Sequence, residues 1–139
     1  MIPRFRAWDK LNNEMYVVEQ INLNRGEFES IGYGITFLRG ADKVELMQST
    51  GIRDMSNQEI FEGDVVKTTR FVGRADEVGG FYEYDKEFIG IVKQLEGSWV
   101  IDTGSDAVCL WTEIEENEII GNIYENPELL EEKNETRNN

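Results

Sequence analysis

The sequence predicts a mainly β protein of the α+β class: a small antiparallel β-barrel-like domain with an N-terminal β-hairpin extension and a short C-terminal helix. Apolar and polar residues alternate with a period of two over most of the chain, as they do in half-buried strands. Turn-forming Gly, Asn and Asp residues divide these segments into short pieces. Closely spaced short strands are typical of an antiparallel meander that curls into a barrel or a sandwich.

The beginning of the chain predicts a β-hairpin. Residues Arg4–Trp8 alternate between charged and apolar side chains, residues 9–13 form a polar turn, and Glu14–Val18 resumes with β-favouring residues. A second extended region is expected over Phe28–Leu38, where two glycines at positions 32 and 34 indicate a bulge or a bend.

The middle and the second half of the chain predict a series of short strands. They are expected at Val44–Ser49, directly after Gly63-Asp64, at Phe88–Leu95, Ser98–Asp102, Ala107–Thr112 and Glu118–Tyr124. The segments between them contain polar and turn-forming residues. The main ones are a polar connection over Thr50–Glu59, an exposed loop over Val72–Gly80 and a tight turn at Glu96-Gly97.

A helix start is encoded near the end of the chain by Asn126, Pro127 and Glu128. Asn can cap free amides, Pro is preorganised for the first helical position, and Glu is favoured at the positive end of the helix dipole. We expect a short helix over about 127–133. Residues 134–139 carry nothing apolar to bury and are expected to form a disordered tail.

The chain is strongly acidic, with 28 Asp and Glu against 14 Lys and Arg and a net charge of −14. Residues 1–70 have a net charge of −2 and residues 71–139 a net charge of −12. Such a surface repels phosphate backbones, so we expect no direct binding to nucleic acid. The exception would be the short basic patch of Arg4, Arg6 and Lys10, although a strand that alternates charged and apolar faces also explains it.

The composition also bears on chemistry and location. There is no His and a single Cys, which excludes an imidazole base, a mixed His/Cys zinc site and an internal disulfide. We therefore expect a protein that is not an enzyme. The apolar runs are far shorter than a membrane span and no signal-like apolar segment follows the N-terminus. A reducing cytoplasm is the expected compartment.

Several residue groups deserve comparison with known site chemistry. Asp54, Ser56, Asn57 and Glu59 suggest an oxygen-ligand calcium loop, but the glycine of its sharp turn is missing, which favours an ordinary turn. Carboxylate pairs could hydrolyse a glycoside if they were buried and differently tuned, or simply form a solvated face. These pairs are Glu113 with Glu115 and Glu115 with Glu118.

Three further groups have a structural explanation. Gly32 and Gly34 do not complete a phosphate-binding pattern, and Cys109, within an apolar strand, is expected to be buried. The aromatic residues could line a ligand pocket or pack in the core. They are Trp8, Trp99 and Trp111 together with Phe5, Tyr16 and Phe61. We assign no catalytic, cofactor-binding or metal-binding residue and no cofactor.

Four segments, taken together, are similar to the YopX family. They are Arg4–Asp9 followed by Met15-Tyr16, Leu46–Asp54, Glu59–Val66 and Ile119–Leu130, and their order and spacing match over nearly the whole chain. The resemblance implies a bacteriophage or prophage origin, a mixed fold rich in β-structure with a barrel-like part, and a homo-oligomer. It implies no known activity and no catalytic or ligand residues. The segment Val72–Asp85 departs most from the family pattern.

The resemblance predicts one YopX-like domain over residues 1–133, with an N-terminal β part at about 1–43 and a barrel-like part at about 44–124. Two of its segments also have a physical explanation. In Glu62–Val66 the glycine permits a turn, Asp64 can bond amides within it and the valines enter the core. In Gly121–Tyr124, Ile123 is expected to face inward, whereas Asn122 and Tyr124 face solvent or reach a neighbouring element.

The leading functional hypothesis is a phage or prophage accessory protein that acts, without catalysis, as an oligomeric binding or interaction module with a host or phage protein partner. An alternative is an acidic decoy that blocks the groove of a host nucleic-acid-binding protein. A second alternative is a carboxylate-based hydrolase, which requires at least two acids converging in a cleft.

Overall fold

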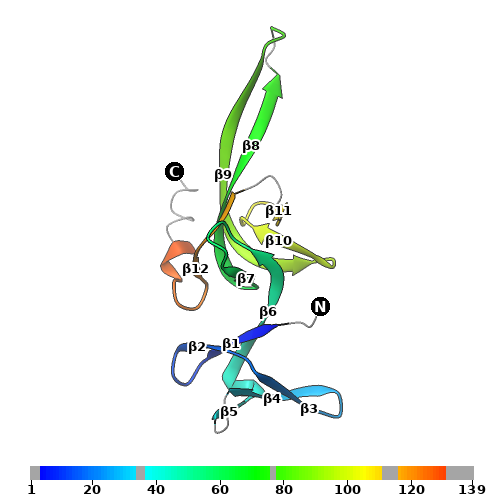
Figure 1. Ribbon diagram of the computed structural model, residues 1–139, viewed down its shortest axis with the longest axis vertical. Helices are drawn as coiled ribbons and strands as arrows, with labels where there is room; N and C mark the ends of the chain where they lie inside the picture. Colours follow the sequence, from blue (N-terminus) through cyan, green and yellow to red (C-terminus); the bar gives the residue numbers. More distant parts are fainter. Residues whose placement is uncertain (1–3, 34–36, 76–77, 111–115, 131–139) are drawn as a thin grey trace. The chain divides into compact units, whose positions relative to one another are not determined.

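The computed structural model describes residues 4–33, 37–75, 78–110 and 116–130 (Figure 1). The chain divides into two compact units, Met1–Ser49 and Thr50–Asn139, and each is described by itself below. The fold is mostly β, with antiparallel sheets, a curled half-barrel and one short C-terminal helix, which confirms the predicted fold class.

Unit 1 begins with the expected hairpin. Strand β1 (Phe5–Asp9) pairs with β2 (Glu14–Val17) on one side and with the first half of β6 (Val44–Arg53) on the other. A second sheet has the order β3-β4-β5, from β3 (Gln20–Asn24), β4 (Glu27–Tyr33) and β5 (Phe37–Gly40).

The expected single region Phe28–Leu38 is therefore parts of two antiparallel strands, and the sequence analysis missed β3 altogether. The register irregularity falls between Asn22 and Leu23, not at Gly32, which is regularly paired with Gln20 and Leu38. Position 34 lies outside the described residues.

The rest of unit 1 is a short 3-10 helix and a small apolar core. The 3-10 helix η1 (Ala41–Lys43) leads into β6. The core consists of buried side chains from three strands together with half-buried neighbours. The buried members are Ala7, Ile31 and Val44, and Val18, Phe28 and Leu46 pack against them.

Unit 2 is built on a five-stranded antiparallel sheet with the order β11-β10-β9-β8-β12. Its strands are β8 (Asp64–Ala75), β9 (Phe81–Leu95), β10 (Ser98–Asp102), β11 (Ala107–Cys109) and β12 (Glu116–Asn122). The second half of β6 lies beside β7 (Glu59–Phe61) in the sheet order β2-β1-β6-β7.

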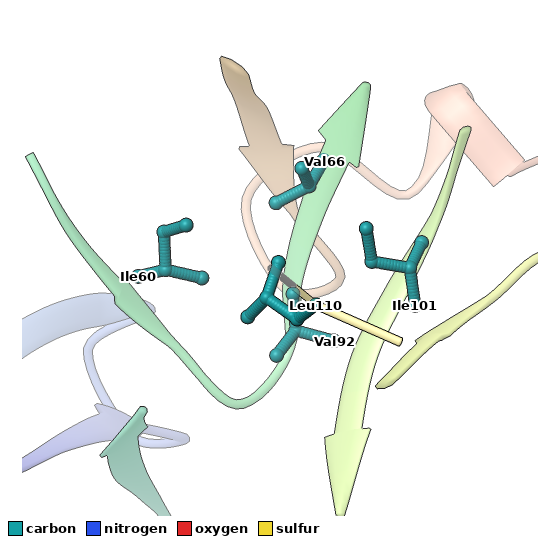
Figure 2. Packing of buried hydrophobic residues seen from close by; sticks show 5 residues of the cluster. All are labelled: Ile60, Val66, Val92, Ile101 and Leu110. Atoms are coloured by element: carbon teal, nitrogen blue, oxygen red, sulfur yellow. The ribbon is translucent and has the colours of Figure 1, made fainter. Parts of the chain in front are cut away.

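The core of unit 2 lies between these strands. Figure 2 shows five buried side chains directed toward one another: Ile60, Val66, Val92, Ile101 and Leu110. Half-buried Ile52, Trp99 and Ile119 pack against them. Because the members come from β7, β8, β9, β10 and the residue after β11, the burial of this apolar surface holds the sheet in one arrangement.

The structure corrects two predicted connections. Strand β6 continues through Arg53, so the connection to β7 comprises only residues 54–58 instead of Thr50–Glu59. The expected loop Val72–Gly80 is in part strand, because β8 continues to Ala75, whereas residues 78–80 lie outside any strand; β9 begins at Phe81 instead of Phe88. In this region the backbone groups of β8 and β9 form hydrogen bonds with each other, and this pairing makes a strand of a glycine-containing segment that by itself favours a loop.

The tight turns follow the predictions more closely. Glu96 and Gly97 have φ values of 49° and 83°, as in a turn whose twist matches two hairpin strands. They join β9 to β10, which spans the predicted residues. At the end of the chain, residues 128–130 are helical and Pro127 lies in the turn before them; residues 131–133 of the predicted helix and the tail lie outside the described residues.

Candidate interaction site

The group around Asp54 forms a turn that is fastened to β12. Asp54 is 8% exposed, and its Oδ1 accepts hydrogen bonds from the backbone N–H groups of Ser56 and Gln58, both at 2.9 Å. Its Oδ2 accepts from the N–H of Ile119 at 3.1 Å. Both carboxylate oxygens thus bind backbone amides, which explains the group as a structural turn.

A second buried carboxylate organises the turn between β7 and β8. Asp64 is 1% exposed and its Oδ2 accepts from the N–H of Phe61 at 2.8 Å. Gly63, with a φ of 87°, donates its N–H to Val92 and accepts from Ile123. The predicted turn is confirmed, and the following residues Val65 and Val66 are fully buried as expected.

The segment after β12 is built around Asn122, which lies opposite Asp64 in the register. Asn122 is buried, and its Oδ1 accepts from the N–H groups of Tyr124 and Glu125 at 3.0 and 2.8 Å. Ile123, expected to face inward, and Tyr124 are both half-buried. The hydrogen bonds of Asn122 hold the backbone of this segment in place, so they have a structural role.

A third buried carboxylate lies in unit 1. Asp9 is fully buried; it accepts from the N–H of Leu11 at 2.9 Å and from the side chains of Asn12 and Arg39 at 3.3 and 3.1 Å. Lys10, of the basic group considered above, forms an exposed ion pair with Glu45 at 3.4 Å. Arg4 is exposed and Arg6 half-buried in the same strand region.

The other candidate acids do not assemble into a reaction centre in the part of the chain that the structure describes. Glu118 forms an ion pair with Lys67 at 3.7 Å, and both side chains are substantially exposed. Glu113 and Glu115 lie outside the described residues. Over the described ranges, no group of three or more His, Cys, Asp or Glu is arranged to hold a metal ion.

The cysteine prediction was wrong. Cys109 is exposed, because β11 alternates and places Val108 on the buried side, followed by buried Leu110. Among the aromatic candidates, Trp99 packs against the core of unit 2. Trp8, Phe5 and Tyr16 are half-buried in unit 1, Phe61 is half-buried in unit 2, and Trp111 lies outside the described residues.

The most distinctive surface feature of unit 2 is the extension of β8 and β9 beyond their neighbours (Figure 1). Among the described residues, β12 pairs with β8 over Asp64–Thr69, and β10 pairs with β9 over Ile91–Leu95. Residues 70–75 and 81–86, here called the β8–β9 arm, pair with each other in the described chain. Six residue pairs give it a length of about 20 Å.

One face of the arm is basic and aromatic. Directly opposed residues of an antiparallel ribbon share a face, and the register places Lys86 opposite Arg70 and Phe88 opposite Thr68. Lys86 Nζ lies 5.0 Å and Arg70 Cζ 5.8 Å from the centre of the Phe88 ring, within the range of a cation–π interaction. Tyr84, two residues before Lys86 on the same face, is 36% exposed.

The other face is acidic. Glu83, Asp85 and Glu87 alternate with the residues of the basic face and are all exposed. At the base, the Arg70 guanidinium donates a hydrogen bond to the carbonyl of Cys109. This contact fastens the arm to β11, so that the two faces have a fixed orientation relative to the sheet of unit 2.

Sequence reasoning missed this arm, although a signal was present. From Tyr82 to Phe88 the residues alternate strictly between aromatic or basic types and acidic types. The glycines and acids of residues 73–80 favoured a loop and obscured that alternation.

The structure has no helix, among the residues it describes, that is long and apolar enough to cross a membrane. No curated protein matches the chain. A solved structure, the crystal structure of protein EF1440 from Enterococcus faecalis, is similar, with 25% sequence identity and a TM-score of 0.62. The similarity covers 94% of this chain and 99% of that one.

The sequence also matches a family model. The model of the family described as YopX protein matches residues 4–131, which include the turns of Asp54 and Asp64 and the segment around Asn122. By this match over most of its length, the chain belongs to the YopX family.

Proposed function

We propose that this chain is a phage or prophage accessory protein that acts as a non-enzymatic interaction module and assembles into an oligomer. The observation that carries the proposal is the β8–β9 arm, which extends past the neighbouring strands and presents Tyr84 and Lys86 at its surface. A two-stranded ribbon is only marginally stable by itself. Contact with another protein surface would stabilise it.

The use of the buried acids supports a role without catalysis. Asp9, Asp54 and Asp64 each accept hydrogen bonds from backbone amides of a nearby turn. Carboxylates with this role stabilise turns and are not directed at a substrate. The exposed thiol of Cys109 supports the proposal that the protein acts in a reducing compartment, the cytoplasm of the bacterial host.

The assembly part is tested by multi-angle light scattering of the full chain over a concentration series. We expect a mass above that of one chain at micromolar concentration, increasing or reaching a plateau as the concentration rises. A mass equal to one chain at every concentration would contradict assembly.

A second candidate function is the acidic decoy, which is favoured by the exposed row of Glu83, Asp85 and Glu87. A decoy of this kind would occupy the basic groove of a host nucleic-acid-binding protein. Capture from host lysate at low and at high salt distinguishes the two. A decoy retains nucleic-acid-binding proteins at low salt and releases them as ionic strength rises.

A further inference from the structure

We infer that the β8–β9 arm binds the arm of a second copy of this chain, with the basic and aromatic face of one arm against the acidic face of the next. The first face presents Tyr84 and Lys86, with Arg70 over the Phe88 ring, and the second presents Glu83, Asp85 and Glu87. The inference rests on the proposed function, because it names the partner of the interaction module.

The charge of the arm favours a second copy as the partner. The arm residues 70–75 and 81–86 contain three basic residues (Arg70, Arg74 and Lys86) and two acidic ones, and Glu87 follows directly. The register separates Lys86 and Arg70 from the acids by face. A ribbon with oppositely charged faces is complementary to itself. A polyanion, by contrast, would be repelled by the acidic face of the arm and by the net charge of −14 of the chain.

Contact between unlike faces has a consequence for symmetry. The two faces lie on opposite sides of the ribbon, so each arm can bind one neighbour on each side. A head-to-tail contact of this kind forms rings or short filaments instead of stopping at a two-fold dimer.

The experiment uses charge reversal on each face of the full-length protein. Lys86→Glu replaces the exposed base of the first face with an acid, and Asp85→Lys places a base on the acidic face. In sedimentation equilibrium, we expect the dissociation constant for self-association of each variant to be at least about fivefold higher than that of the wild type. An equimolar mixture of the two is expected to recover association, because the variants present complementary faces to each other.

Matched controls come from an exposed pair in unit 1. Lys10→Glu and Glu45→Lys change the net charge by the same amounts at residues about half exposed, and both should associate as the wild type does. Tyr84→Ser is compared with Leu95→Ser, since both are exposed apolar residues of β9; only the first should weaken association. Unchanged thermal unfolding midpoints would show that the variants are folded.

The outcomes separate this inference from the proposed function. Wild-type protein that stays monomeric contradicts both. Wild-type assembly that neither reversal weakens leaves the interaction module standing and overturns the contact between arms. The contact is also overturned if only Lys86→Glu has an effect, if the mixture does not recover association, or if a labelled DNA oligonucleotide binds the wild type and loses binding in Lys86→Glu.

Discussion

The carboxylate of Asp54 binds the backbone N–H of Ile119, at 3.1 Å, across 65 residues of sequence. The same side chain binds two amides of its own turn, and the N–H of Met55 donates to the carbonyl of Asn117 at 2.8 Å. A short connection in the first part of unit 2 is thereby fixed to its last strand. Hydrogen bonds to a buried carboxylate are stronger than those between neutral groups.

Removal of this carboxylate is expected to destabilise unit 2. Asp54→Ala leaves three backbone amides without their acceptor and should lower the free energy of unfolding by about 3 kcal/mol. Asp54→Asn, which keeps one oxygen acceptor, should lose less. Urea unfolding followed by tryptophan fluorescence measures both. The control is Glu116→Ala, at an exposed position outside the arm, and an equal loss in the control would refute the role of Asp54.

Gly90 is required by the closeness of β9 to β10. A Cβ atom at this position would lie 2.3 Å from the carbonyl oxygen of Asp102, which is backbone and cannot turn away. Gly90→Ala should therefore lower the free energy of unfolding by about 2 kcal/mol or more. Gly97→Asn is the control, since it has no neighbour within 4 Å and Asn tolerates positive φ. Thermal unfolding that ranks the control as more harmful would contradict this.

In unit 1, the ion pair between Asp9 and Arg39 should matter more than the pair between Lys10 and Glu45. The Asp9 side chain is 1% exposed, whereas both partners of the second pair are nearly half exposed. Arg39→Ala should cost about 2 kcal/mol, because it removes a cation from a buried carboxylate. Lys10→Ala should cost less than about 1 kcal/mol. If denaturant unfolding shows that both variants lose the same free energy of unfolding, the burial of Asp9 does not make its ion pair the more important one.

Tyr16 should titrate above the ordinary tyrosine value of 10.0. Its hydroxyl donates to Glu14, and this hydrogen bond is the main reason that the pKa is raised. The folded state then holds the proton more tightly than the unfolded state, so this stabilisation is complete below pH 10 and declines as pH rises further. Ultraviolet titration of tyrosinate should show one tyrosine shifting downward in Glu14→Gln. A titration curve identical to wild type would contradict the assignment.

Cys109 should react with a thiol reagent in the native protein. Its side chain is exposed, so a chromogenic disulfide reagent should label the folded chain at a rate close to that of the chain in denaturant. Val108→Cys in a Cys109→Ser background is the comparison, because Val108 faces the core and a thiol there should react at least tenfold more slowly. Slow labelling of the wild type would indicate that another surface covers Cys109.

Local patterns in the sequence were sufficient for the turns and for the strands next to them. Glu96-Gly97 and Gly63-Asp64 combine glycine with residues that suit tight turns, and the strands follow at the predicted positions. Val108 and Leu110 are both apolar and both buried. Because side chains alternate between the two faces of a strand, these two neighbours predict that Cys109 between them is exposed.

The rest depends on contacts between distant residues. Strand β3 has a weak pattern and is fixed by pairing with β4, and the outer part of β8 contains Gly73 and charged residues that suit a loop equally well. The separation of Lys86 and Arg70 from Asp85 requires the register between two strands. Strand pairs of this kind are set by the whole sheet, so a single segment does not reveal them.

Strand β6 has a consequence for how this protein can be divided or recombined. It supplies its first residues to unit 1 and its last to unit 2, and the unit boundary at Ser49 and Thr50 falls within it. A genetic crossover at that boundary would join two halves of one strand from different parents, so the strand that continues from the ladder with β1 to the neighbour β7 would combine unmatched sequences. The two halves are therefore expected to be inherited together as a single piece, instead of being exchanged as independent modules.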